Sequence, residues 1–263
     1  MLRTMILTEN TVLVKYLCSR AGEIRLGPVS APRTARDRIR HELTTEILAV
    51  ARAQLAVQGA AALSLRSIAR DLGMAPSALY RYFDGRDALL SALILGAYTS
   101  LADEAEQAAE TAHQSGQDDL ERWAAVPHTM RSWALARPHE WGLLFGSPVP
   151  GYSAPEETVG PYARLATALV RPLVDALHGG RLADATAGEP AATELGPAVA
   201  PVHQALFPDA AATTVVGVLQ AWAVLVGAIS LEVFGHWRNT VLDPARFFEA
   251  TVADTARALG LRA

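Results

Sequence analysis

The hydrophobic positions of this chain recur at spacings of three to five residues, which is the pattern of helices with one buried face. The first such stretch begins at residue 34 and stops at Gly59, a residue type that commonly follows a helix C-terminus. Other stretches predict longer helices, at about residues 84–111, 120–136, 161–177, 208–237 and 244–259. Because strand signals are few, the sequence predicts an all-α fold.

Two short helices are predicted between residues 64 and 83, with a tight turn between them. Ser64 is a good N-cap for the first, because its hydroxyl can accept a hydrogen bond from a free N–H of the first turn. Gly73 ends that helix, and Pro76 suits the first turn of the next, where its missing N–H has no intrahelical partner. Such a pair is typical of a helix-turn-helix, although helix hairpins that only pack together share the pattern.

The second short helix has two distinct faces. At about 100° per residue, Leu79 and Phe83 point inward, whereas Ser77, Ala78 and Arg81 point away. In a helix-turn-helix this helix enters the major groove of DNA, so its outward side chains would face base edges. Arg81 is the best candidate for a bidentate contact with guanine, which gives about 1–3 kcal/mol of discrimination.

Charge is distributed unevenly along the chain. Residues 33–90 hold nine arginines against six carboxylates, whereas residues 91–263 hold ten arginines against nineteen carboxylates. When one part of a chain is basic and the rest is acidic, the basic part is the one expected to bind a polyanion. The charge pattern therefore favours nucleic-acid binding by the N-terminal part.

Composition bounds the compartment. Cys18 is the only cysteine, which excludes an intramolecular disulfide and fits a reducing cytoplasm. Residues 215–231 are nearly all apolar, but they are short for a membrane span and lack flanking Lys or Arg, so we expect a helix buried in a core or interface. Residues 1–33 lack helical periodicity and show no secretory signal, so we expect a poorly ordered leader or a start codon that was assigned too far upstream.

The segment LSLRSIARDLGMAPSALYRYFDGRDALL, residues 63–90, resembles the DNA-binding segment of the TetR family of bacterial transcriptional regulators. The resemblance implies a three-helix DNA-binding domain at residues 34–85. It implies that Ser64 contacts phosphate, that Tyr80 and Tyr82 clamp the DNA backbone, and that Arg86 stands where the family usually carries a lysine. The full set of implied DNA contacts is Ser64, Arg66, Ser77, Ala78, Tyr80, Arg81, Tyr82 and Arg86. The sequence departs from the family at Ala75, where a capping Ser or Thr is common, and at Met74, where Val is common.

Residues 86–263 are expected to form a larger helical domain for effector binding and dimerisation, with a mobile loop at 178–201. The segments PHEWGLLFGSPVPGY, at residues 138–152 between two helical patterns, and AWAVLVGAISLEVFGHW resemble one subclass of TetR C-terminal domains. The resemblance implies a homodimer, and we expect a close helix interface at Gly217, Val224, Gly227, Ala228, Leu231 and Gly235. An ordinary monomeric core helix is the alternative.

Aromatic side chains of the C-terminal part suit a pocket for a small hydrophobic or aromatic effector. The candidates are His128, Trp133, Trp141, Phe145, Tyr162 and Trp222. The alternative for each one singly is a place in the core. Glu232 and His236, one turn apart, are expected to pair on the helix surface, with a place in the pocket wall or a metal site as the alternatives.

The sequence therefore predicts a cytoplasmic, ligand-responsive repressor that binds palindromic operator DNA as a homodimer. The alternatives are an activator of the same family and a helical dimerisation module that does not bind DNA. No HExxH, GxSxG or phosphate-binding glycine loop is present in the sequence, and no Cys/His cluster has metal-ligand spacing. We expect no enzymatic activity, no cofactor and no metal.

Overall fold

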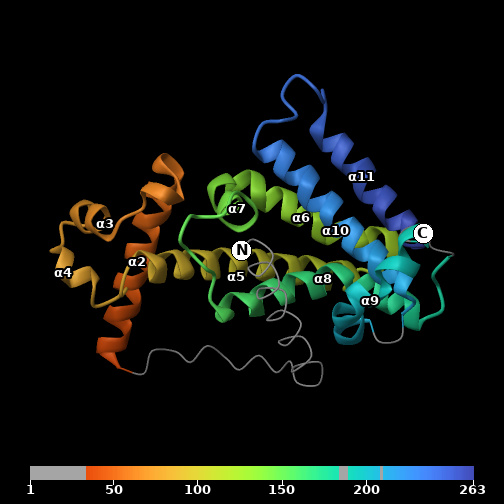
Figure 1. Ribbon diagram of the computed structural model, residues 1–263, viewed down its shortest axis with the longest axis horizontal. Helices are drawn as coiled ribbons and strands as arrows, with labels where there is room; N and C mark the ends of the chain where they lie inside the picture. Colours follow the sequence, from red (N-terminus) through yellow and green to blue (C-terminus); the bar gives the residue numbers. More distant parts are fainter. Residues whose placement is uncertain (1–33, 184–188, 208–209) are drawn as a thin grey trace. The chain divides into compact units, whose positions relative to one another are not determined.

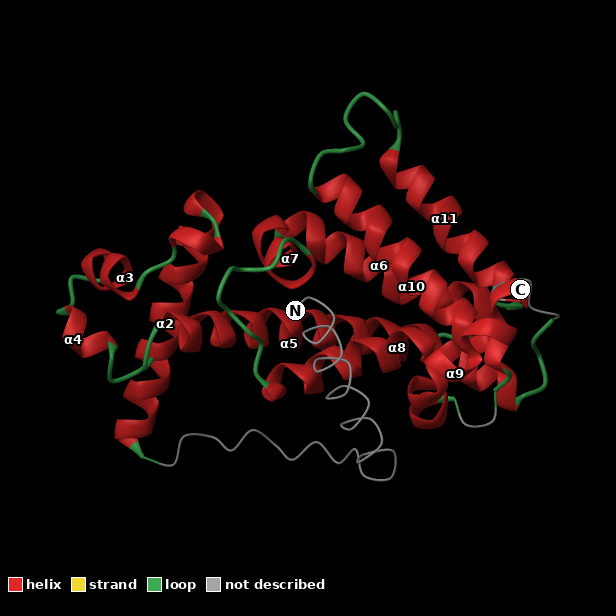
Figure 2. Ribbon diagram, in the orientation of Figure 1, coloured by secondary structure: helices red, strands yellow, loops and turns green. Residues whose placement is uncertain are grey.

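The computed structural model describes residues 34–183, 189–207 and 210–263, so the predicted leader at 1–33 lies outside the described residues. Within the described ranges the chain forms helices and no strand, which confirms the all-α prediction (Figure 2). In chain order the α-helices are α2 (Ala35–Gln58), α3 (Leu65–Asp71), α4 (Pro76–Leu79), α5 (Arg86–Gln114), α6 (Asp119–Ala136), α7 (Pro138–Phe145), α8 (Val159–His178), α9 (Glu189–Leu206), α10 (Ala212–Val233) and α11 (Pro244–Ala258) (Figure 1). Two short 3-10 helices, η1 (Ala60–Ala62) and η2 (Glu156–Thr158), complete this set.

The described residues divide into two compact units. The N-terminal unit consists of the described part of Ile24–Ala97 together with His139–Thr158, and the C-terminal unit consists of Tyr98–Pro138 and the described part of Val159–Ala263. α5 is continuous and contributes residues to both units. The sequence placed the domain boundary after residue 85, before this helix begins.

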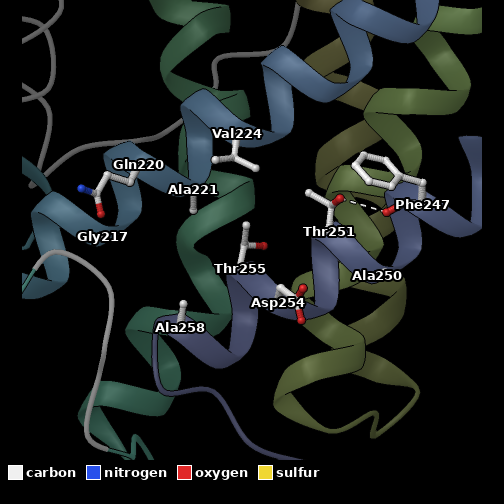
Figure 3. Close-up of a pocket in the computed structure, with 10 residues that line it drawn as sticks. All are labelled: Gly217, Gln220, Ala221, Val224, Phe247, Ala250, Thr251, Asp254, Thr255 and Ala258. Atoms are coloured by element: carbon white, nitrogen blue, oxygen red, sulfur yellow. Dashed lines mark hydrogen bonds between the residues drawn. The ribbon is translucent and has the colours of Figure 1, made fainter. Parts of the chain in front are cut away.

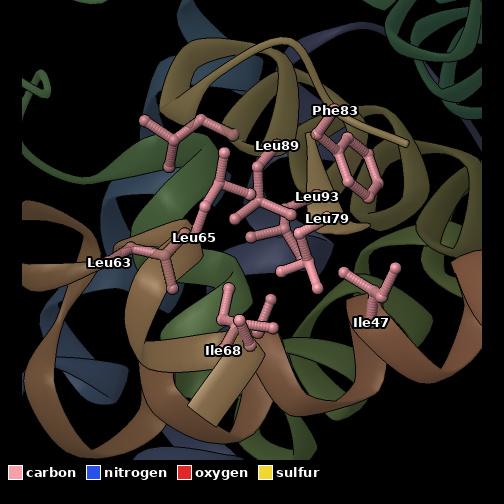
Figure 4. Packing of buried hydrophobic residues seen from close by; sticks show 11 residues of the cluster. Ile47, Leu63, Leu65, Ile68, Leu79, Phe83, Leu89 and Leu93 are labelled. Atoms are coloured by element: carbon pink, nitrogen blue, oxygen red, sulfur yellow. The ribbon is translucent and has the colours of Figure 1, made fainter. Parts of the chain in front are cut away.

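The N-terminal unit is built on one apolar cluster (Figure 4). Ile47 of α2, Ile68 of α3, Leu79 of α4 and Leu89 of α5 are completely buried in it. Burial of such side chains stabilises a fold by about 1.5–3 kcal/mol each, which is how very short helices such as α3 and α4 are held in place. Leu79 and Phe83, the inward residues that the sequence predicted for the second short helix, both pack in this cluster.

A segment from much later in the chain closes the same core. Leu143 of α7 and Tyr152 in the loop after it pack against the apolar cluster. The carboxylate of Glu140 accepts a hydrogen bond from Arg52 Nε of α2 at 3.3 Å, and the Tyr152 hydroxyl lies 3.0 Å from Ser91 Oγ of α5. The sequence treated residues 138–152 as a break between helices, but its first half is the helix α7.

The C-terminal unit is arranged around α6, which packs against α8, α10 and α11. Two indole groups of α6 are completely buried and satisfied: Trp123 Nε1 donates to Thr255 Oγ1 at 3.2 Å, and Trp133 Nε1 donates to Ser100 Oγ at 3.1 Å. Buried indole N–H groups need such partners, because an unpaired donor in a core costs about 1–3 kcal/mol. These bonds tie α6 to α11 and to α5.

The loop predicted at residues 178–201 is largely wrong, since α9 (Glu189–Leu206) occupies its second half. α9 packs extensively against α10, and this tertiary contact stabilises a helix that contains Gly196 and Pro197. Residues 184–188 lie outside the described residues.

The most apolar 18-residue window of α10 has a mean hydropathy of 2.0, so the helix could cross a membrane by length and composition alone. Half of that window is buried within the chain. This burial agrees with the predicted packing helix, and the apolar composition is only weak support for a span.

Candidate nucleic-acid interface

α3 begins and ends at the residues that the sequence indicated. The hydroxyl of Ser64 accepts a hydrogen bond from the N–H of Ser67 at 3.2 Å, so Ser64 is the N-cap. At the other end Gly73 has φ of +64°, and the Met74 N–H donates to the carbonyl of Ala69 at 2.8 Å. This left-handed turn satisfies the last carbonyls of the helix and redirects the chain towards α4.

α4 is shorter than predicted. Its regular part is the single turn Pro76–Leu79, and turns continue through Tyr82, whose N–H donates to the carbonyl of Leu79 at 2.9 Å. Ala75 stands at the N-cap position and makes no capping bond through its side chain, which agrees with the missing cap noted from the sequence. The helix is therefore held in place mainly by the packing of Leu79, whose exposed fraction is 0%.

The outward face of α4 carries the predicted base-reading residues. Ser77 and Arg81 are exposed and Ala78 is half-buried, as the helical wheel predicted. Tyr80 is 49% exposed, whereas Tyr82 is half-buried.

The remaining predicted DNA contacts differ in accessibility. Arg66, on the first turn of α3, is exposed. Arg86, at the start of α5, directs Nη2 to the carbonyl of Ala60 at 3.0 Å, and its Nη1 lies 4.0 Å from Oδ1 of Asp87. Arg86 therefore has a role within the unit that the sequence did not predict, because it adds a side-chain donor to the Ala60 carbonyl of η1, which also accepts from the Leu63 N–H at 3.3 Å.

Arg40 of α2 was not among the predicted site residues, yet it contacts the end of the α4 region. Its Nη2 donates to the carbonyl of Arg81 at 3.3 Å, and its Cζ lies 5.4 Å from the centre of the Tyr82 ring. The sequence contains only a weak signal for this contact, the arginines of the first turns of α2, because the partners are 41 residues apart.

The six aromatic candidates for an effector pocket are divided between the two units. Trp141 and Phe145 lie in the N-terminal unit with ring centres 4.3 Å apart, and Trp141 is completely buried. Trp133 is also buried, and His128 packs edge-to-face on Phe248 at 5.8 Å. Partial burial of the imidazole lowers the pKa of His128.

Tyr162 and Trp222 are brought together, and Tyr98, which the sequence analysis did not select, joins them. The ring of Tyr162 stands edge-to-face with Trp222 at 5.8 Å and with Tyr98 at 5.7 Å. Burial raises the pKa of the Tyr98 and Tyr162 hydroxyls above the ordinary value, because the phenolate is poorly solvated there. This aromatic trio is formed by α5, α8 and α10.

α10 and α11 enclose an open groove of about 540 Å³ (Figure 3). Val224 of α10 and Phe247 of α11 line it and are 48% and 44% exposed. Gln220, Val224, Leu231 and Phe234 are all exposed along α10, at spacings that keep them on one side of the helix. An apolar helix with an exposed apolar stripe of this kind is typical of a surface that another protein covers.

Of the six predicted interface residues, three face open space, two are buried, and the sixth, Gly235, forms a turn. Val224 and Leu231 are exposed, and a side chain at Gly227 would meet open space. Ala228 is buried, and its carbonyl accepts a hydrogen bond from Trp237 Nε1 at 3.2 Å, so it belongs to the chain's own packing. Gly217 is also buried, although it lines the groove.

Gly235 forms a turn at the end of α10 and not the predicted close helix contact. Its φ is +79°, and the N–H of His236 donates to the carbonyl of Leu231 at 2.8 Å, which is the same C-terminal turn that Gly73 makes. The predicted surface pair of Glu232 with His236 is wrong, because the carboxylate of Glu232 binds Arg131 of α6 instead. A bidentate ion pair between two helices thus replaces the local pair.

Comparison with known proteins identifies the group to which these features belong. Residues 47–93 match the family described as bacterial regulatory proteins, tetR family, and residues 123–255 match the tetracyclin repressor-like C-terminal domain. The HTH-type transcriptional regulators Mb1846 of Mycobacterium bovis and Rv1816 of Mycobacterium tuberculosis are each 39% identical over 219 residues, which cover 80% of this chain and 89% of theirs. The chain belongs to the TetR family of transcriptional regulators.

Solved structures agree with membership of the TetR family. The crystal structure of SCO4313 is 35% identical, covers 84% of this chain and 98% of its own, and gives a TM-score of 0.68. A Rhodococcus sp. RHA1 protein of unknown function, 23% identical, covers 83% of this chain and 95% of its own with a TM-score of 0.61, so it shares the fold.

For this TetR family chain, the match at 47–93 spans α3, α4 and their turn. The exposed face of α4 thus belongs to the helix-turn-helix of a DNA-binding transcriptional regulator. The family and the curated relatives are regulators and not enzymes. Among the described residues, no three His, Cys, Asp or Glu side chains are grouped so that they could hold a metal ion.

Proposed function

We propose that this TetR family regulator is a cytoplasmic, ligand-responsive repressor that binds palindromic operator DNA as a homodimer. The observation that carries the DNA-reading part of this proposal is the division of α4 into two faces. Leu79 is completely buried, whereas Ser77 and Arg81 are exposed on the opposite side. A helix anchored in this way presents its outer side chains to the major groove without losing core contacts.

The predicted contacts divide into those that read bases and those that hold phosphates. Ser77 and Ala78 of α4, together with Arg81 in the turn that continues it, would face base edges. Tyr80 and Tyr82 flank that face and would clamp the sugar-phosphate backbone, which fixes register but carries no sequence information. Ser64, Arg66 and Arg86 would add phosphate contacts from the neighbouring helices.

The exposed surface of α10 and α11 supports the homodimer. Val224, Leu231 and Phe234 form an exposed apolar stripe that follows α10 to its C-cap. Phe247 of α11 lies across the groove from Val224 (Figure 3). Two copies of this helix pair would form a four-helix arrangement across a two-fold axis. Two recognition helices held about 34–36 Å apart would then read two half-sites one DNA turn apart.

The aromatic trio supports a site for a small hydrophobic or aromatic effector. Tyr98, Tyr162 and Trp222 bring three aromatic rings together, which supply the large apolar surfaces that a flat ligand needs. Tyr98 lies on α5, the continuous helix that begins at Arg86 next to the DNA-reading helices. An effector that prefers a conformer unable to bind DNA would shift the equilibrium and release the operator.

Selection of DNA from a random pool, followed by gel-shift measurements at several salt concentrations, tests the DNA part of the proposal. We expect a palindromic preferred sequence whose half-sites lie one helical turn apart. Arg81→Ala should lose preference at one base pair of each half-site and keep most of its affinity for other DNA. A wild-type protein with no sequence preference would contradict the proposal. A reporter gene under this operator, measured with and without the protein, separates repression from activation.

Light scattering tests the homodimer. The wild-type chain should have twice the mass of the 28.0 kDa monomer at micromolar concentration. Val224→Glu should produce monomers, because it places a charge on the apolar stripe, whereas Leu135→Glu on α6, another exposed apolar site, should leave the dimer intact. A monomeric wild-type protein would contradict the interface.

A further inference from the structure

The end of the DNA-reading helix depends on support from outside itself. α4 has one regular turn, no side-chain N-cap and one completely buried residue, Leu79. Isolated helices of this length are unstable in water. The orientation of the Arg81 side chain therefore depends on the contacts that hold the backbone in place after residue 79.

Arg40 makes two contacts with that part of the backbone. Its Nη2 donates to the carbonyl of Arg81 at 3.3 Å, and its guanidinium lies over the ring of Tyr82, with Cζ 5.4 Å from the ring centre. A hydrogen bond from a charged donor is stronger than one between neutral groups, and cation–π stacking adds to it. One side chain of α2 thus fixes two successive residues of the DNA-reading face.

We propose that Arg40 is a positioning residue for base recognition, which orients Arg81 and Tyr82 from α2. This inference rests on the proposed base contact of Arg81. Without Arg40, the backbone at Arg81 would sample more orientations, and the guanidinium of Arg81 would lose the geometry that a bidentate contact needs. Contacts with phosphate tolerate such movement better, since they depend mainly on charge.

The chain supplies a matched control on the same helix. Arg38 is exposed like Arg40 and carries the same charge, but at about 100° per residue it points to nearly the opposite side of α2. Arg38→Ala therefore removes one positive charge from α2 without removing the contacts with Arg81 and Tyr82. Arg40→Lys keeps the charge but cannot reproduce the planar stacking of a guanidinium.

The test uses the full-length chain and a DNA duplex selected by the wild-type protein. The base pair at which Arg81→Ala loses preference is changed in a second duplex, and the ratio of the two Kd values is measured for each variant. We expect a ratio of about tenfold or more for wild type, from one bidentate base contact. Arg40→Ala should lower this ratio to nearly that of Arg81→Ala, and Arg38→Ala should retain it. The double variant Arg40→Ala/Arg81→Ala should discriminate no less than Arg81→Ala alone.

A purely electrostatic role of Arg40 would give a different result. In that case Arg40→Ala and Arg38→Ala would weaken binding to both duplexes equally, and Arg40→Lys would restore wild-type behaviour fully. Either result would overturn the proposal. We expect instead that Arg40→Lys keeps the wild-type salt dependence but only part of the discrimination, which also serves as the test if Arg40→Ala is unstable.

Failure of the proposed function looks different from failure of this inference. If wild type shows no preference, or Arg81→Ala keeps it, the base contact of Arg81 is absent and the inference falls with it. If Arg81→Ala loses the preference while Arg40→Ala retains it, only the role of Arg40 is wrong.

Discussion

Arg131 of α6 and Glu232 of α10 form a bidentate ion pair, with Nε 2.7 Å from Oε2 and Nη2 2.5 Å from Oε1. The two side chains are 19% and 13% exposed, so the pair is largely shielded from water. The carboxylate raises the pKa of Arg131, and the guanidinium also lies over the ring of Phe248. Charge and packing therefore join α6, α10 and α11 at one place.

Removal of one partner should destabilise the protein, because the other charge would be left partly buried. Breaking a buried pair costs about 3–5 kcal/mol, and we expect about 2–3 kcal/mol for Arg131→Ala because some water reaches this site. Urea unfolding measures the loss. Arg171→Ala, which removes an exposed pair with Glu110, should cost much less, because water screens that pair. Equal losses in the two variants would show that shielding does not strengthen the first pair.

The turn between α3 and α4 should depend on the absence of a side chain at Gly73. Its φ of +64° costs an L-residue about 1–2 kcal/mol, so Gly73→Ala should lower the free energy of unfolding by that amount. Gly73→Asn should cost less, because Asn tolerates this region better. Gly85→Ala is the control, since Gly85 lies just before α5 at an ordinary φ with open space around it. A loss as large in Gly85→Ala would argue against backbone strain as the cause.

Alkaline pH should destabilise the folded chain through its buried tyrosines. Burial holds the pKa of Tyr98 above its ordinary value, whereas the unfolded chain releases this proton near pH 10. The folded state then binds more protons than the unfolded state, so stability is fully present below about pH 10 and falls as the pH rises further. Melting temperatures from pH 8 to 11 should fall less steeply for Tyr98→Phe than for wild type. Identical slopes in wild type and Tyr98→Phe would contradict the prediction.

Arg86 should contribute to stability as well as to DNA binding. Arg86→Ala removes the donor to the carbonyl of Ala60, and we expect a loss of about 1 kcal/mol in the free energy of unfolding. If it also contacts one phosphate, the variant should lower the slope of log K against log salt by about 0.9. Arg66→Ala, at an exposed position, should change the slope but not the stability. Unchanged stability in Arg86→Ala would mean that the bond to Ala60 contributes nothing to folding.

The helices of the N-terminal unit could be predicted because their local signals agree with their packing. Ser64 caps α3, Gly73 turns the chain, and Leu79 is buried where the periodicity placed it. α9 could not be predicted in this way. Its composition, with Gly196 and Pro197, is typical of loops, and its stability comes from packing on α10, which no local pattern reveals.

The candidate site shows the same limit. The outward position of Arg81 followed from its place on a helix, but the contacts of Arg40 and Arg86 did not, because their partners lie 41 and 26 residues away. Glu232 illustrates the point most clearly. The sequence offered a neighbour one turn away, and the fold supplied a stronger cation 101 residues distant.

The N-terminal unit is discontinuous in the sequence, since α7 and the loop after it complete a core whose other helices come from residues 34–97. A fragment cut at the end of α5 would contain every residue of the helix-turn-helix and still lack Leu143, Tyr152 and the partner of Arg52. Such a fragment would expose apolar surface and should aggregate more readily than the intact chain. A gene fusion that exchanges DNA-binding specificity between relatives must therefore transfer both stretches of sequence or keep both. A single junction would separate the helices of this core from α7 and the loop that complete it.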